Sequence, residues 1–213
     1  MQKQLVKRLL AFRNRPASVN SAVVALDPGH GGNDSGAIGV SGVYESTVNL
    51  RIAALVKQRL KAQGVRVVIL RTGNTTLSLD DRRKLARQSG ADLFVAIHNN
   101  SSTSGKTSGT EVYYYRAFSQ PLASNVHKSL VSAWREIYKG NAAMTDKIVP
   151  KDGGVRYYLF RVTRIEECPA VLVECGYLSN TTECNAVCQP ANQEKLAGAI
   201  ANGILRYIEN NTA

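Results

Sequence analysis

The sequence lacks any long apolar run. Across its 213 residues, no uninterrupted hydrophobic stretch approaches the roughly 20 residues that a helix needs to cross a bilayer. The composition, 44% hydrophobic and 20% charged, is typical of a globular domain. We therefore expect no membrane span, and the length suits one domain of ordinary size.

Acidic residues are scarce. There are 16 aspartates and glutamates against 27 lysines and arginines, so the net charge is +11. Such a charge implies an acidic partner, which could be a nucleic acid, an anionic membrane surface or an anionic polymer of a cell wall. The basic residues are scattered and form no recognition motif for nucleic acid. We therefore expect no specific nucleic-acid binding.

The first twenty residues are basic and contain no acid. Their short apolar stretch is broken by Lys7 and Arg8, so the hydrophobic core of an export signal is not evident. We expect residues 1–20 to form a basic arm or linker. Residues 21–213 contain no internal repeat and no linker, and we expect them to form a single domain.

Cysteine is limited to four residues in the last third of the chain, at Cys168, Cys175, Cys184 and Cys188. No two of them form the C-x-x-C pair of a zinc ribbon. Buried free thiols are the favoured interpretation. A disulfide between Cys184 and Cys188 remains an alternative.

Apolar segments and amphipathic segments alternate along the chain. Strands are expected at 22–27, 65–70, 92–98, 110–115 and 170–174, and helices at 48–63, 78–89, 122–137 and 196–208. Several of these strands are wholly apolar, which is typical of strands buried on both faces. The pattern predicts an α/β fold in which helices cover both faces of a central sheet. The segment 141–154 is expected to be irregular.

Three of the predicted strands end in residues that can bind a metal or transfer a proton. The first runs into the stretch DPGH, which ends at His30, the third ends at His98, and the last ends at Glu174. Ligands of open α/β sheets bind at the carboxyl ends of strands. Glu45 precedes the first helix and is expected on a loop that returns over the same crevice.

His30, Glu45 and His98 together make a His₂Glu set, the ligand set of a catalytic zinc site with one open position. Each residue also has an ordinary interpretation, since a lone histidine is more often structural and Glu45 suits a helix N-terminus. Glu174 follows the apolar run AVLV directly. Its carboxylate must therefore be paired, protonated or functional.

Five ordered motifs carry a resemblance to a known family. The segments VVALDPGHGGNDSGAIG, YESTVNL, ADLFVAIHNNSS, GTEVYYY and PAVLVECGYLSN resemble the signatures of zinc-dependent N-acetylmuramoyl-L-alanine amidases, the amidase-3 family of cell-wall hydrolases. The likeness extends from Val23 to about Ile208. It implies a mixed, mostly parallel sheet with helices on both faces. It also implies Zn²⁺ held by His30, Glu45 and His98, with Glu174 as the catalytic residue.

The function implied by this resemblance is hydrolysis of the amide bond between N-acetylmuramic acid and L-alanine in peptidoglycan. The implied location is extracytoplasmic, in the cell wall, the periplasm or the medium. The basic surface would favour anionic wall polymers. Some members of the family carry an autoinhibitory helix between the second histidine and the catalytic glutamate, and here we expect an open site.

The glycine-rich stretch around His30 is expected to shape the site. Gly29, Gly31 and Gly32 would let the backbone turn tightly while keeping space free over the metal. We also hypothesise that Asp27 orients the imidazole of His30.

Three rival functions remain open on the sequence. A zinc peptidase would use the same residues on a different bond. A thiol hydrolase would use Cys175 as nucleophile, although Cys175 and Glu174 should point to opposite faces of their strand. A non-catalytic wall-binding module would keep the fold alone.

Overall fold

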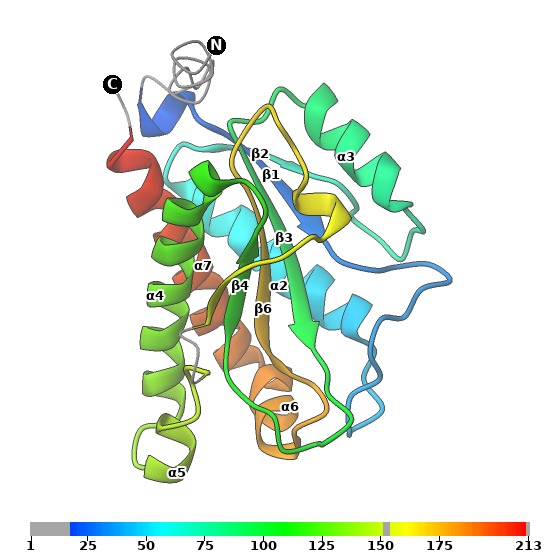
Figure 1. Cartoon of the computed structure of the whole chain (residues 1–213), viewed down its shortest axis with the longest axis vertical. Helices are drawn as coiled ribbons and strands as arrows, with labels where there is room; N and C mark the ends of the chain where they lie inside the picture. The colour runs from blue at the N-terminus through cyan, green and yellow to red at the C-terminus, as the bar shows by residue number, and fades with distance from the viewer. Residues whose placement is uncertain (1–17, 151–153, 212–213) are drawn as a thin grey trace.

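The computed structural model describes residues 18–150 and 154–211, and six strands in this part form one sheet in the order β2-β1-β3-β6-β4-β5 (Figure 1). The strands are β1 (Val23–Pro28), β2 (Arg66–Ile69), β3 (Leu93–Asn100), β4 (Glu111–Tyr114), β5 (Val155–Tyr157) and β6 (Ala170–Tyr177). β1, β2, β3 and β6 are parallel, whereas β4 is antiparallel to β6 and pairs in parallel with β5. The predicted mixed, mostly parallel sheet is confirmed.

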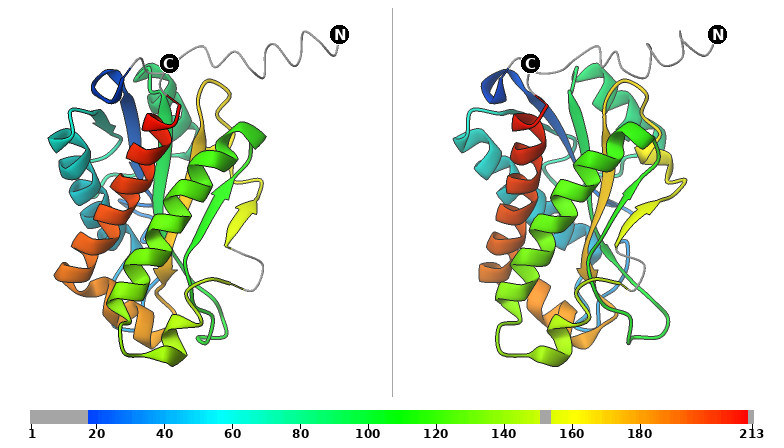
Figure 2. Two further views of the ribbon diagram at one scale, coloured as in Figure 1. Left: turned by 90° about the vertical axis from the view of Figure 1, so that its left-hand side faces the viewer. Right: turned by 60° about the vertical axis from the view of Figure 1, so that its left-hand side comes forward.

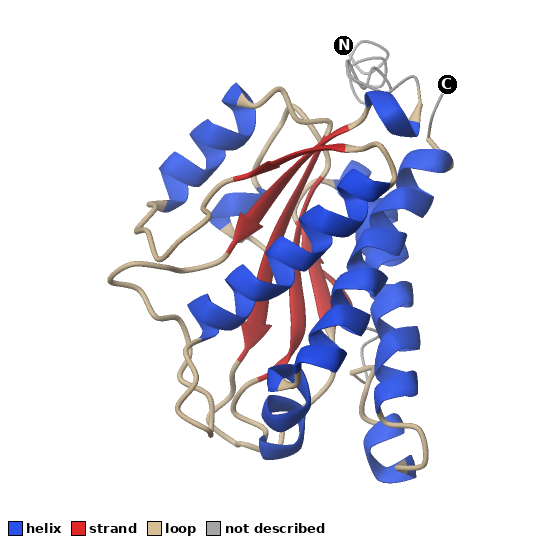
Figure 3. Cartoon of the chain, turned by 180° about the vertical axis from the view of Figure 1, so that it is seen from behind, coloured by secondary structure: helices blue, strands red, loops and turns tan. Residues whose placement is uncertain are grey.

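Helices cover both faces of the sheet, as predicted. The helices are α2 (Glu45–Ala62), α3 (Leu79–Gln88), α4 (Gln120–Ile137), α5 (Ala142–Thr145), α6 (Thr181–Cys188) and α7 (Pro190–Glu209), with 3₁₀ turns η1 (Val19–Ser21), η2 (Ala117–Ser119) and η3 (Arg161–Thr163). α2, α4 and α7 pack on one face, which Figure 3 shows toward the viewer. α3 and η3 contribute to a smaller cluster on the other face.

The strands with continuous apolar runs are buried on both faces, as the sequence pattern predicted. All six residues of β1 are buried. Side chains alternate along a strand, so Val24 and Leu26 join the cluster with α2, while Val23 and Ala25 join the cluster with α3. A strand covered in this way needs a continuous apolar run.

Three short elements were not predicted. α6 begins at Thr181, after the N-cap Asn180, whose side chain accepts hydrogen bonds from the backbone N–H groups of Thr182 and Glu183. β5 has only three residues and is too short to show a pattern. The segment 141–154, expected to be irregular, contains the four-residue helix α5.

The expected arm at 1–20 lies mostly outside the described residues, although Val19 packs against the main core.

All four cysteines are free thiols, so the alternative of a Cys184–Cys188 disulfide is not supported. Among the described helices, none is long and apolar enough to cross a membrane.

The carboxyl ends of β1, β3 and β6 meet at one edge of the sheet. Pro28 pairs with Ile97 in the ladder, and His98 pairs with Glu174. Residues directly opposite in a ladder project to the same face. The register therefore brings the histidine at the end of β3 beside the glutamate of β6.

The helical layer depends on close packing of α4 against α7, which run side by side in Figure 2. Gly203 of α7 faces the backbone of α4, and a Cβ at this position would lie 2.5 Å from the Cα of Val126. Gly198, five residues earlier in α7, has only the flexible side chain of Arg59 nearby, at 3.5 Å. The two glycines therefore differ in what surrounds them.

We predict opposite effects of adding a methyl group at these two positions. Gly203→Ala should lower the free energy of unfolding by about 1–3 kcal/mol, because α4 and α7 must separate. Gly198→Ala should raise it by about 0.5–1 kcal/mol, since alanine favours the helix and fits the available space. Urea denaturation of both variants measures this, and equal shifts of the midpoint would contradict the packing argument.

Candidate metal centre

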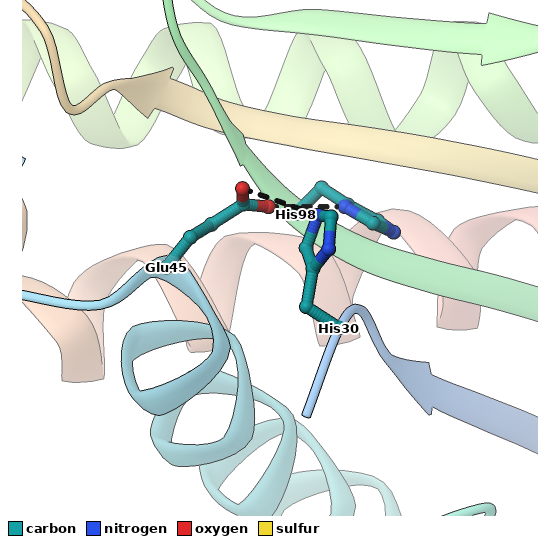
Figure 4. Close-up of side chains that lie close together, drawn as sticks. All are labelled: His30, Glu45 and His98. Atoms are coloured by element: carbon teal, nitrogen blue, oxygen red, sulfur yellow. Dashed lines mark hydrogen bonds and ion pairs between the residues drawn. The ribbon is translucent and has the colours of Figure 1, made fainter. Parts of the chain in front are cut away.

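Three of the predicted site residues converge on one point (Figure 4). His30 lies in the loop after β1, Glu45 is the first residue of α2, and His98 lies near the end of β3. Their donor atoms all lie within 4.8 Å of one another. Nε2 of His30 is 3.2 Å from Oε2 of Glu45, and Nδ1 of His98 is 3.0 Å from Oε1. Glu45 was expected on a loop, but it belongs to the helix.

Hydrogen bonds hold the carboxylate of Glu45 in place. The side chain of Asn49, one turn along α2, donates to Oε1 at 3.0 Å, and the backbone N–H of Ala37 donates to Oε2 at 2.9 Å. Burial disfavours the charged form, but hydrogen bonds with His30 and His98 outweigh it and lower the pKa of Glu45. The carboxylate is therefore ionised and aimed at the two imidazoles.

The carboxylate of Asp34 fixes the tautomer of His30. Nδ1 of His30 lies 2.7 Å from Oδ2 of Asp34. Because an ionised carboxylate only accepts, Nδ1 carries a proton toward Asp34, and Nε2, which faces the ionised Glu45 at 3.2 Å, must give up its proton to offer a lone pair to a metal. Burial opposes protonation, yet Glu45 and Asp34 raise the pKa of His30. The hypothesis that Asp27 orients this ring is wrong.

Asp27 is instead part of a buried ion pair. Its side chain is fully buried, and Oδ1 accepts a hydrogen bond of 2.5 Å from Arg82, which is 4% exposed. Arg82 also donates to the carbonyls of Pro28 (2.9 Å) and His30 (2.8 Å). The aspartate of the DPGH stretch therefore anchors an arginine that holds the turn after β1.

A second buried arginine completes this support. Arg71 donates to the carbonyls of Pro28 (2.8 Å), Gly29 (2.8 Å) and Ser46 (2.7 Å). The loop after β1 and the first turn of α2 are thereby tied together. This role of Arg71 and Arg82 is not evident from the sequence, where arginines bear only on the net charge. The one available signal was that Arg71 directly follows a predicted strand.

Two glycines make room for the three side chains. A Cβ on Gly29 would lie 2.2 Å from the imidazole of His98, and a Cβ on Gly36 would lie 2.6 Å from Oε2 of Glu45. The predicted need for open space is confirmed at Gly29, while Gly36 was missed. His30 itself has φ of 59°, the one positive φ outside glycine in the described residues. Such strained backbone is often found at functional sites.

Glu174 lies beside the cluster and has a different environment. It pairs with His98 across the β3–β6 ladder and is 8% exposed. Its Oε2 has no hydrogen-bond partner among the described residues. Burial raises the pKa of Glu174, and the nearby charges of Glu45 and Glu111 raise it further.

These residues fit a divalent metal ion. Two imidazoles and a carboxylate are the donor set that zinc takes in catalytic sites, where a fourth position stays open to water. The unpartnered Glu174 oxygen is a buried acceptor that lacks a donor, which a bound water would satisfy. The arrangement can therefore hold a metal and place a base beside it.

Two other reactive side chains, those of Cys175 and His127, lie elsewhere. Cys175 is fully buried in the cluster on the opposite face of the sheet, and burial raises the pKa of its thiol. A thiol nucleophile at this position has no access to substrate. His127 of α4 is buried and donates to the carbonyl of Thr110, so it is structural.

The site is open to solvent on the described structure. The long helix α4, which accounts for much of the chain between His98 and Glu174, packs with α7 on the opposite face of the sheet. The side chain of His30 remains 26% exposed. The expectation of an open site agrees with both observations.

Comparison with known proteins gives one consistent result. The family model for N-acetylmuramoyl-L-alanine amidases matches residues 24–206. The chain is 40% identical to the catalytic domain of CwlV, an N-acetylmuramoyl-L-alanine amidase from Bacillus (Paenibacillus) polymyxa var. colistinus, with a TM-score of 0.77 over 88% of this chain and 98% of that one. It is 34% identical to the amidase AmiC2 of Nostoc punctiforme, with a TM-score of 0.78 over 88% and 97% of the two chains.

A longer relative shows the same likeness over part of its length. The chain is 35% identical over 188 residues to the N-acetylmuramoyl-L-alanine amidase LytC of Bacillus subtilis (strain 168). The match covers 86% of this chain and 35% of LytC. The similarity is thus confined to about a third of that protein.

We predict that Arg82 is a large contributor to stability. Arg82→Leu should lower the free energy of unfolding by about 3–5 kcal/mol, because it leaves the Asp27 carboxylate buried without its partner. Arg83→Leu, at the neighbouring and more exposed position, should cost no more than about 1 kcal/mol. Chemical denaturation compares the two. Restoring part of the loss by adding Asp27→Asn to Arg82→Leu would identify the unpaired charge as the cause.

We predict that Asp34 supports metal affinity. Asp34→Ala should weaken binding of Zn²⁺ about 10- to 100-fold, since His30 loses the acceptor that fixes its tautomer. Competition with a chromophoric chelator measures the affinity. Asn33→Ala, at an exposed neighbouring position, serves as the control. An unchanged affinity in Asp34→Ala would show that the 2.7 Å contact does not orient the ligand.

Proposed function

The chain belongs to the N-acetylmuramoyl-L-alanine amidase family, and we propose that it is a zinc enzyme that cleaves the amide bond between N-acetylmuramic acid and L-alanine in peptidoglycan. The observation that carries this proposal is the convergence of His30, Glu45 and His98 beside the unpartnered carboxylate of Glu174. The activity follows from family membership. Zinc and the role of each residue are our proposal.

His30, Glu45 and His98 would hold the zinc. Bound zinc would polarise the scissile carbonyl and lower the pKa of a coordinated water toward ~7. Nε2 of His30 would give its lone pair to the zinc, while Nδ1 keeps its proton in the hydrogen bond to Asp34. The ionised Glu45 lowers the net positive charge of the site and is held by Asn49 and Ala37.

Glu174 would act as the general base and then as the general acid. Its raised pKa makes its carboxylate a better proton acceptor than an exposed glutamate. It would take a proton from the attacking water and transfer it to the nitrogen of the leaving L-alanine. An amide nitrogen leaves poorly until it is protonated, so one group with both functions meets the chemical need.

The place of action follows from the substrate. We infer that the chain acts outside the cytoplasm, in the cell wall, and that its charge of +11 favours anionic wall polymers. A hollow of about 440 Å³ whose lining includes Arg83, Arg116, Arg161 and Arg164 supports this preference. In the described structure, part of this positive charge is balanced by Glu166 and Asp80.

The proposal is tested by the products formed from purified peptidoglycan. The protein with one bound zinc should release muropeptide stems with N-terminal alanine, and a chelator should abolish the release. Other new amino termini would favour a zinc peptidase. Zinc binding without any release would favour a wall-binding module.

We predict that Glu174→Gln separates catalysis from metal binding. This variant should lose activity by at least about 100-fold while keeping one zinc per chain, because glutamine cannot transfer the proton. Cys175→Ala is the matched control at the next position in β6 and should stay active. Alanine release by Glu174→Gln at the normal rate would remove Glu174 from the mechanism, and an inactive, folded Cys175→Ala would reopen the thiol alternative.

A further inference from the structure

A row of polar side chains extends from the metal centre across the sheet. His98 of β3 pairs with Glu174 of β6, and Glu174 pairs with Glu111 of β4. Two residues along β4, Tyr113 pairs with Arg156 of β5. Because partners in a ladder project to the same face, all five side chains lie on the face that carries the metal centre.

Glu111 connects the metal centre to Arg156. Its buried carboxylate accepts hydrogen bonds from Arg156 (2.8 Å), Asn100 (3.1 Å), Tyr113 (2.5 Å) and Tyr177 (3.2 Å). Four donors fix this carboxylate and, through it, one side of the Arg156 guanidinium. The side chain of Arg156 is still 32% exposed. It is therefore held in place and also accessible.

Arg156 lies in a cavity with aromatic walls. The cavity has a volume of about 580 Å³ and is lined by Tyr113, Arg156, Tyr157, Tyr158 and Phe160. The guanidinium lies 6.0 Å from the ring centre of Tyr113, and the ring centres of Tyr158 and Phe160 are 4.6 Å apart. Tyr157 and Tyr158 are more than half exposed. We refer to this hollow as the tyrosine–arginine cavity.

The loop that follows His30 has a different character. The loop that leads into Glu45 exposes Ile38, Val40 and Tyr44, and residues 36–44 contain no charged side chain. The substrate of the proposed reaction is also asymmetric, since the glycan is neutral near the scissile bond and the stem peptide carries carboxylates. Charge complementarity therefore assigns the peptide to the side of Arg156.

The spacing suits the second residue of the peptide. Strands of a sheet lie about 4.8 Å apart and residues along a strand about 3.4 Å apart, so Arg156, two strands across and two residues along from Glu174, is ~12 Å away. Two residues of extended peptide span ~7 Å from the scissile bond, and the length of an arginine side chain covers the rest. An arginine can also bind a carboxylate through two parallel hydrogen bonds.

We propose that the tyrosine–arginine cavity binds the stem peptide, with Arg156 selecting a free α-carboxylate on the residue that follows L-alanine. This inference rests on the proposed function and adds a substrate preference to it. Where that residue is a glutamate, the enzyme prefers it to the amidated form, which presents a neutral carboxamide at the same place. Tyr158, which is more than half exposed, packs against the peptide beside the carboxylate.

Two synthetic substrates that differ in one group provide the test. They are N-acetylmuramoyl-L-alanyl-γ-D-glutamyl-L-lysine and the same compound with the α-carboxylate of its glutamate amidated. The zinc-loaded wild-type protein should have a KM about 10-fold lower for the carboxylate form, with similar kcat. Arg156→Gln should reduce this ratio to about 1, and Arg156→Lys should leave it in between.

The ratio is measured within each variant, so a general loss of activity in Arg156→Gln does not hide the result. Arg135→Gln, which removes an exposed arginine from the last turn of α4 on the opposite face of the sheet, should keep the wild-type ratio. Calorimetry with the two free tripeptides provides a readout without turnover, in which the wild type should bind the carboxylate form about 10-fold more tightly.

The outcomes separate this inference from the proposed function. If the wild type cleaves neither compound, the proposed function fails and the preference falls with it. If it cleaves both with equal KM, or if Arg156→Gln keeps the preference, the amidase function stands and the assignment of Arg156 is overturned. A preference for the amidated compound would also overturn it.

Discussion

Two buried guanidinium groups, those of Arg71 and Arg82, hold the turn on which the metal centre depends. They donate hydrogen bonds to the carbonyls of Pro28, Gly29 and His30, where β1 ends. A buried charge is stable only with a partner, and Asp27 provides one for Arg82. The backbone turn that carries His30 is therefore held through main-chain carbonyls, whereas Asp34 orients its imidazole.

The support of the metal centre comes from three directions. The ladder between β3 and β6 places His98 against Glu174, and the first turn of α2 presents Glu45 to both imidazoles. The strained loop after β1 supplies His30 and, four residues later, the carboxylate that fixes its tautomer. Preorganisation of this kind means that little rearrangement is needed when a metal binds.

The same face of the sheet continues beyond the metal centre. Glu111 accepts hydrogen bonds from residues of β3, β4, β5 and β6, so it joins the catalytic end of the sheet to the edge at β5. Chemistry and peptide recognition would then share one rigid platform. The helical face, where α4 and α7 pack through Gly203, stabilises that platform from behind.

The fold class, the main strands and helices, and the four residues that gather at the carboxyl ends of strands could all be predicted from the sequence. It could do so because buried strands require apolar runs, and because polar residues at their ends stand out from those runs. Short elements such as β5 and α6 left too few residues for a pattern. The family resemblance supplied what separate residues could not, namely that His30, Glu45 and His98 act together.

The partner of each carboxylate, by contrast, depends on how the chain folds in three dimensions. Asp27 and Asp34 flank His30 in the sequence, yet one pairs with Arg82 and the other with the imidazole. The choice follows from the direction of each side chain after the turn and from α3, which brings Arg82 under β1. The roles of Gly36 and Arg156 likewise depend on close approaches between distant segments. Local sequence patterns do not predict such distances, because the distances arise only when the sheet and its loops have packed.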